Sequence, residues 1–175
     1  MVRSEALPKR ITRRPWPGRA TTEQRGQPHE ARAGAYRDAP TVHYEPLPQN
    51  LVGLTIVVVD DDEWSLDYFA TALRTCGAVV LTASTAPAAL QQIQAQRPDA
   101  VLSDIAMVGQ DGYWLIGEIR ALADDATKRV PVVAATAFGV EHSRERVMAA
   151  GFSEHLRKPV DPEVLCRTIG RLAGR

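Results

Sequence analysis

The chain has 175 residues, of which 45% are hydrophobic and 24% charged, and these proportions fit one globular domain with an additional segment. Its 21 basic and 21 acidic residues balance, but residues 1–50 hold nine basic and five acidic residues, whereas residues 51–175 hold twelve and sixteen. No apolar run approaches the roughly eighteen residues of a membrane helix, and the N-terminus lacks the apolar core of a signal peptide. The sequence therefore predicts a cytoplasmic protein without membrane contact.

Residues 1–50 differ in amino-acid composition and apolar pattern from the rest of the chain. They contain seven of the twelve prolines and almost no periodic apolar pattern, so they bury too little apolar surface to offset the entropy of ordering. We interpret residues 1–50 as a disordered Pro- and Arg-rich tail or linker, and residues 51–175 as the folded domain. Cys76 and Cys166 match no metal-ligand spacing, and we interpret both as small buried apolar residues in a reducing compartment.

Strand and helix patterns alternate through residues 51–175. Short apolar runs predict five strands, and longer runs with apolar residues at helical spacing predict five helices. The predicted strands are 56–59, 78–82, 100–104, 130–137 and 154–157, and the predicted helices cover 64–76, 87–93, 115–122, 141–150 and 162–172. This alternation predicts a doubly wound, flavodoxin-like α/β fold with a five-stranded parallel sheet in the order 2-1-3-4-5.

Carboxylates follow two of the predicted strands. Strand 56–59 runs directly into Asp60, Asp61 and Asp62, and strand 100–104 ends in Asp104. A single Asp is enough to cap the next helix, so three adjacent carboxylates favour a divalent-cation site over a cap alone. With the order 2-1-3-4-5, these two strands flank the switch point, where sheets of this kind bind ligands.

Two further residues complete the predicted site. Thr136 ends the fourth strand, and Lys158 follows the fifth strand directly before Pro159. Taken singly, a Thr at a strand end is more often structural and a lone Lys is usually a surface residue. Together with the carboxylates they favour a phosphoryl-handling site, because a metal ion and Lys neutralise phosphoryl oxygens while a carboxylate acts as nucleophile.

These motifs resemble one known family, the receiver domain of two-component response regulators, and are most similar to the receivers of hybrid histidine kinases. The resemblance covers roughly residues 54–173. The motifs that carry it are Val58-Val59-Asp60-Asp61, Leu102-Ser103-Asp104, Asp111-Gly112-Tyr113, Ala135-Thr136-Ala137 and Leu156-Arg157-Lys158-Pro159.

The resemblance implies a role for each matching residue. Asp104 would be the phosphoacceptor, taking a phosphoryl group from the phosphohistidine of a histidine kinase or a histidine phosphotransfer protein. Mg²⁺ would be held by Asp61, Asp104 and the main-chain carbonyl of Ala106, with Asp60 acting mainly through a water. Thr136 would bond a phosphoryl oxygen, and Lys158 would bridge Asp104 and then the phosphate. The Lys158–Pro159 peptide would be cis.

The resemblance also implies what the protein does as a whole. Such a domain is a phosphoprotein that catalyses only its own Mg²⁺-dependent phosphorylation and dephosphorylation. It would act without direct DNA binding, by switching a partner or by relaying phosphate. Two positions depart from the family: Val108 stands where Pro is common, and His155 stands at the aromatic switch position.

Two alternatives remain open from the sequence. Asp60-Asp61-Asp62 also resembles the nucleophile motif of haloacid dehalogenase-type phosphohydrolases, with Asp60 as the nucleophile; Asp104 would then have no role. The other alternative is a receiver-fold scaffold that is never phosphorylated, which would be expected to have an incomplete pocket.

Overall fold

A computed structural model describes residues 47–137 and 142–175. Five parallel strands form one sheet in the order β2-β1-β3-β4-β5, so the predicted fold and strand order are confirmed. The strands are β1 (Thr55–Val59), β2 (Val79–Ala83), β3 (Ala100–Asp104), β4 (Val132–Thr136) and β5 (Glu154–Arg157). The helices are α1 (Glu63–Thr75), α2 (Ala86–Gln96), α3 (Gly112–Ala121), α4 (Asp125–Lys128), α5 (Arg144–Ala149) and α6 (Pro162–Leu172).

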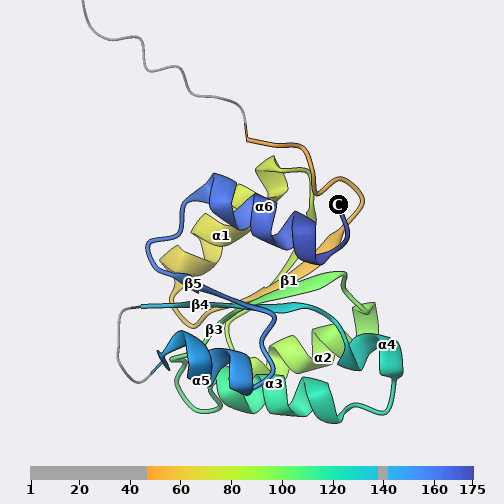
Figure 1. Ribbon diagram of the computed structural model, residues 1–175, viewed down its shortest axis with the longest axis vertical. Coiled ribbons are helices and arrows are strands. Elements are labelled where there is room, and N and C mark those ends of the chain that lie inside the picture. Colours follow the sequence, from red (N-terminus) through yellow and green to blue (C-terminus); the bar gives the residue numbers. More distant parts are fainter. Residues whose placement is uncertain (1–46, 138–141) are drawn as a thin grey trace, which may run out of the picture. The chain divides into compact units, whose positions relative to one another are not determined.

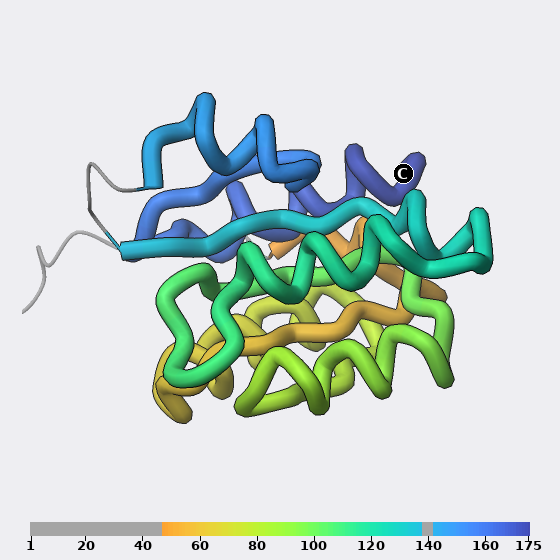
Figure 2. The backbone as a smooth tube through the Cα atoms, turned by 90° about the horizontal axis from the view of Figure 1, so that it is seen from below, coloured from red at the N-terminus to blue at the C-terminus, as the bar shows by residue number. Residues whose placement is uncertain are grey.

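Helices cover both faces of the sheet, with α1 and α6 on one face and α2, α3 and α5 on the other (Figure 1). In the perpendicular view, α2 and α3 run side by side across the second face (Figure 2). The central strands are buried on both sides, which explains their continuous apolar runs. Ile56 and Val58 pack with the α1–α6 side, whereas Val57 and Val59 pack with the α2–α3–α5 side.

The helix starts follow from local chemistry. Asp62 caps α1 by accepting the Ser65 N–H at 2.8 Å, and Asp111 caps α3 by accepting the Trp114 N–H at 2.7 Å. At α6, Asp161 accepts two N–H groups and Pro162 occupies the first turn. Asp62 therefore works as a cap, while Asp60 and Asp61 are left for other partners.

One short helix was not expected. The sequence predicted five helices, but the described residues also form the four-residue helix α4, capped by Asp124. The apolar pattern could not reveal it, because α4 is a single turn with only Thr127 buried. The predicted start of the helix before β5, Glu141, lies outside the described residues.

The interpretation of the two cysteines was wrong. Cys76 and Cys166 form a disulfide, with their Cα atoms 6.4 Å apart. Cys76 directly follows α1 as its C-terminal cap and Cys166 lies on α6, and these two helices pack on the same face of the sheet. The two residues are 90 positions apart in the chain, so only the fold brings them together. Both are buried, as expected, but they are not free thiols in this structure.

Candidate functional site

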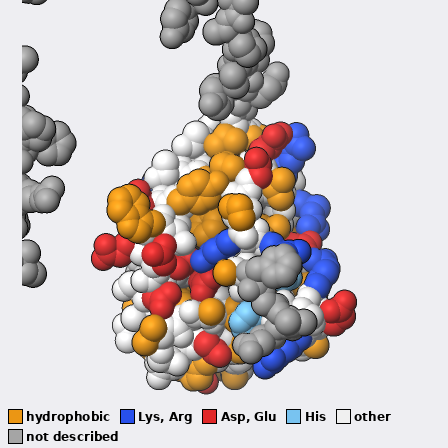
Figure 3. Space-filling view, turned by 90° about the vertical axis from the view of Figure 1, so that its left-hand side faces the viewer, with side chains coloured by type: hydrophobic (Ala, Val, Ile, Leu, Met, Phe, Trp, Pro, Cys, Tyr) orange, Lys and Arg blue, Asp and Glu red, His pale blue; other side chains and the backbone are white. Residues whose placement is uncertain are grey.

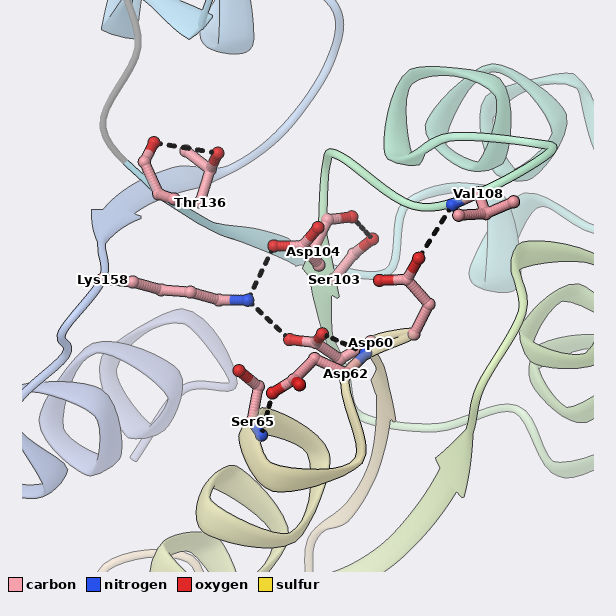
Figure 4. A network of polar contacts seen from close by, with 10 residues as sticks. Asp60, Asp62, Ser65, Ser103, Asp104, Val108, Thr136 and Lys158 are labelled. Atoms are coloured by element: carbon pink, nitrogen blue, oxygen red, sulfur yellow. Dashed lines mark hydrogen bonds and ion pairs between the residues drawn. The ribbon is translucent and has the colours of Figure 1, made fainter. Parts of the chain in front are cut away.

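The carboxyl ends of three strands bring the predicted charged residues together. Asp60 follows β1, Asp104 ends β3 and Lys158 follows β5. In Figure 4 the Lys158 side chain reaches across the edge of the sheet and ends between the two carboxylates. Its Nζ donates to Asp60 Oδ2 at 2.6 Å and to Asp104 Oδ1 at 2.7 Å. The order of the strands therefore makes one site from residues that are 98 and 54 positions apart.

Burial sets the electrostatics of this group. Asp60 is 2% exposed and Asp104 is 6% exposed. Burial raises the pKa of Asp60, and the ammonium of Lys158 opposes this rise only in part. Burial alone would lower the pKa of Lys158, but its hydrogen bonds to Asp104 and Asp60 outweigh that effect, so its pKa is raised. Lys158 is thus held as a cation between the two carboxyl groups.

Asp61 occupies the open side of the cluster. Its Oδ2 accepts the backbone N–H of Val108 at 2.9 Å, which ties the end of β1 to the loop after β3. Proline has no N–H group and could not make this bond. The departure from the family at Val108 therefore has a structural consequence, since it supplies a donor that fixes Asp61.

Three carboxylates lie close enough together to hold a cation. Oxygens of Asp60, Asp61 and Asp104 lie within 4.8 Å of one another. Both oxygens of Asp60 already accept hydrogen bonds, one from Lys158 and one from the Asp62 N–H. The hydrogen bonds described at Asp61 and Asp104 use one oxygen each, so the second oxygen of each remains for a metal. Oxygen ligands of this kind suit Mg²⁺.

A glycine lets α3 begin close to the site. The Gly112 N–H donates to Ile105 O at 2.9 Å, and a Cβ atom at Gly112 would lie 2.4 Å from Asp104 O. Any side chain here would push the first turn of α3 away from the loop that follows Asp104. The sequence indicated Gly112 only as part of a motif, and this steric reason becomes visible in the structure.

The remaining predicted residues do not join the ion-pair network. Thr136 is buried at the end of β4, and its hydroxyl donates to Ala137 O at 3.2 Å (Figure 4). Ala106 is exposed in the loop after β3. His155 lies on β5 beside Ala134, and its Nε2 is buried with no hydrogen-bond partner among the described residues. The Lys158–Pro159 peptide is cis, as expected.

Two contacts at the site were missed by the sequence analysis. The Tyr68 hydroxyl donates to Val160 O at 2.7 Å and so fastens α1 to the segment after Lys158. Phe69 lies beneath the lysine, with its ring centroid 5.7 Å from Nζ. Both aromatic residues lie on α1, and the sequence analysis assigned neither of them to the site.

The acidic edge is also visible on the surface. Figure 3 looks at one side of the molecule, where acidic side chains gather with a basic side chain next to them and hydrophobic side chains lie above.

None of the helices among residues 47–137 and 142–175 has the length and apolar character needed to span a membrane.

Comparisons with known proteins agree with this geometry. A 14.6 kDa protein of Leptolyngbya boryana, encoded beside sodA1, is 38% identical over 69% of this chain and 91% of its own length. Hybrid signal transduction histidine kinase D of Dictyostelium discoideum is 32% identical over 63% of this chain, which spans only 8% of that kinase.

A solved structure also shows similarity to receiver domains. The receiver domain of the sensor histidine kinase PA1611 from Pseudomonas aeruginosa, solved with a magnesium ion in its active-site cleft, is 31% identical with a TM-score of 0.64. The match covers 71% of this chain and all of that one. The family model for the response regulator receiver domain matches residues 56–170. With its sheet order, carboxylate cluster and bridging lysine, this chain belongs to the response regulator receiver domain family.

Proposed function

We propose that Asp104 is the phosphoacceptor of this two-component receiver domain. The observation that carries the proposal is the position of its carboxylate: Oδ1 accepts a hydrogen bond from the Lys158 ammonium, while its other oxygen is left for metal or phosphorus. A carboxylate held beside a fixed cation at the edge of a sheet can attack a phosphoryl group whose negative charge is neutralised locally.

The reaction follows from these contacts. A carboxylate oxygen of Asp104 forms a bond to phosphorus, and the bond from phosphorus to the donor ring nitrogen breaks. The electron pair of that bond stays on the nitrogen, and because the other ring nitrogen carries a proton, the donor leaves as neutral imidazole. Lys158 stabilises the oxygens of the resulting acyl phosphate. The Thr136 hydroxyl, which now bonds Ala137 O, would turn to a phosphoryl oxygen. We propose that His155 responds to this movement as the switch residue.

We also propose Mg²⁺ as the cofactor, held by Asp61, Asp104 and the carbonyl of Ala106, with Asp60 acting through a water. When bound, Mg²⁺ would neutralise charge on the transferring group. The hydrogen bonds that both oxygens of Asp60 accept support its indirect role. At about ten times its dissociation constant, Mg²⁺ would stabilise the fold by about 1.4 kcal/mol. We expect Mg²⁺ to raise the melting temperature of the wild type but not of Asp61→Ala.

The biological setting is part of the same proposal. The phosphodonor would be a histidine kinase or a histidine phosphotransfer protein, and the protein would act in the cytoplasm by partner switching or phosphate relay, without direct DNA binding. It would turn over no substrate other than its own acyl phosphate. Residues 1–50 would be a tail or linker and residues 51–175 the receiver, although Leu47 already packs against the domain core.

The phosphohydrolase alternative is not favoured. It requires Asp60 as the nucleophile, yet both oxygens of Asp60 accept hydrogen bonds, and it leaves Asp104, which binds the same lysine, without a role. The scaffold alternative predicts an incomplete pocket, whereas the acidic cluster and Lys158 are both in place.

Incubation with Mg²⁺ and acetyl phosphate tests the proposal. We expect the intact mass of the wild type to rise by one phosphoryl group, and Asp104→Asn to show no such rise. Asp111→Asn is a matched control, because Asp111 caps α3 on the same loop without touching Lys158. Equal phosphorylation of Asp104→Asn and the wild type would contradict the proposal.

A further inference from the structure

Two of the groups proposed to bind Mg²⁺ are held in place by different parts of the chain. Asp61 follows β1, whereas Ala106 lies in the loop after β3. A site that takes ligands from two segments binds its cation more tightly when the segments are already held together, because the cation then does not have to order them. The contacts that hold this loop beside Asp61 therefore affect the affinity for the cation.

The loop is anchored on both sides of Ala106. Before it, the carbonyl of Ile105 accepts the Gly112 N–H at 2.9 Å. After it, the Met107 side chain is buried and packs in the core on the α2–α3–α5 side of the sheet. Ala106 itself is exposed. Both contacts tie the loop to the α3 side of the domain, and neither of them involves Asp61.

The Val108 N–H connects the loop to Asp61. It donates to Asp61 Oδ2 at 2.9 Å, and Figure 4 shows this bond. The Val108 side chain is 87% exposed, so its packing contributes little, and the residue acts on the site through its backbone. Because Val108 lies two residues after Ala106, this hydrogen bond holds the carboxylate of Asp61 beside the segment that carries the Ala106 carbonyl.

We propose that Val108 is a positioning residue of the Mg²⁺ site, whose N–H holds Asp61 and the Ala106 segment together before the cation binds. The inference rests on the proposed Mg²⁺ cofactor and adds a residue whose backbone, not its side chain, sets the affinity for the cation. The hydrogen bond between Lys158 and Asp104 does not involve Val108. The Val108 N–H therefore acts on cation binding and not on the attack of Asp104 on phosphorus.

Val108→Pro tests the proposal, and Val108→Ala is its matched control. Proline removes the N–H group, whereas alanine keeps it and removes only exposed side-chain atoms. The full chain is titrated with Mg²⁺ alone and followed by NMR. We expect the dissociation constant of Val108→Pro to be about three- to tenfold higher than that of the wild type, as the loss of one solvent-exposed hydrogen bond predicts. Val108→Ala should bind Mg²⁺ as the wild type does.

Phosphorylation by acetyl phosphate separates cation binding from the chemical step. The Mg²⁺ concentration that gives half the maximal rate should rise in Val108→Pro by the same factor as the dissociation constant. The rate at saturating Mg²⁺ should stay close to that of the wild type. A lower maximal rate with an unchanged Mg²⁺ dependence would overturn the proposal, because the substitution would then have disturbed the loop without changing cation binding.

Hydrogen exchange of the Val108 amide gives a readout that needs no substitution at that position. Without Mg²⁺, this amide should exchange more slowly in the wild type than in Asp61→Ala, and the Gln110 amide of the same loop should exchange alike in both. Equal exchange of the Val108 amide in the two proteins, or equal Mg²⁺ affinities of Val108→Pro and Val108→Ala, would overturn this proposal alone. A wild type that binds no Mg²⁺ would overturn the proposed cofactor as well.

Discussion

On one face of the sheet, α1 and α6 are joined by the Cys76–Cys166 disulfide; on the other, a single guanidinium joins α3 to the segments that lead into β4 and β5. Arg120 donates to Lys128 O at 2.7 Å, to Val130 O at 2.9 Å and to Gly151 O at 2.8 Å. The disulfide joins residues that are 90 positions apart, whereas the carbonyls bound by Arg120 lie 8, 10 and 31 positions from it. One can be cut by a reductant and the other only by mutation, so the two faces can be destabilised separately.

The disulfide should give the largest effect. It closes a loop of 90 residues, and constraint of the unfolded chain on this scale stabilises a fold by about 2–4 kcal/mol. We expect dithiothreitol to lower the urea midpoint of the wild type, and Cys76→Ala/Cys166→Ala to unfold at the reduced midpoint with or without reductant. Two titratable thiols in the native, unreduced protein would show that the α1–α6 face is not cross-linked.

Replacement of Arg120 should cost somewhat less. Arg120→Met leaves carbonyl oxygens of the α3 face without their donor, and we expect a loss of about 2–3 kcal/mol in the free energy of unfolding. Arg120→Lys should recover only part of it, because an ammonium cannot match the planar fork. Arg74→Met is the control, since Arg74 is exposed and makes one long hydrogen bond to Val80 O. If Arg120→Met and Arg74→Met lower the free energy of unfolding by similar amounts, Arg120 does not hold the α3 face together.

His155 should give the smallest and most specific effect. Burial, followed by the charges of Arg144, Arg157 and His142, lowers its pKa below the usual 6.5. The unfolded chain therefore binds a proton at a higher pH than the folded domain, so stability is fully present above about pH 6.5 and falls as the pH drops towards the folded pKa.

The difference in pH-dependent stability between the wild type and His155→Phe isolates the contribution of the His155 imidazole. We expect the free energy of unfolding of the wild type to fall more steeply than that of His155→Phe between about pH 7 and pH 5. Parallel pH profiles for wild type and His155→Phe would mean that the imidazole is not held neutral by the fold.

The sequence predicted the strands and most of the site because those features are local or follow from topology. The run before Asp60 is apolar on both faces, and the parallel order alone brings Asp60, Asp104 and Lys158 to one edge. The features it missed are contacts between distant segments. Nothing in the sequence around Cys76 or Cys166 indicates that these two residues pair. The Val108 N–H can bind Asp61 only because the fold brings the loop after β3 next to Asp61.

The roles of Thr136 and His155 stay predictions for a different reason. Their positions at the ends of β4 and on β5 are as expected, but the Thr136 hydroxyl bonds its own neighbour and His155 Nε2 has no described partner. Both roles belong to a phosphorylated protein, so the contacts that define them would form only after Asp104 is modified.

The most direct test of the account is to locate the acyl phosphate in the wild-type protein. After incubation with Mg²⁺ and acetyl phosphate, borohydride reduction converts a phosphorylated aspartate to homoserine, and peptide mass mapping finds the residue. We predict homoserine at position 104 alone, and none when Mg²⁺ is removed by a chelator. Homoserine at Asp60, or reduction of neither residue in protein shown to be folded, would contradict the assignment of Asp104.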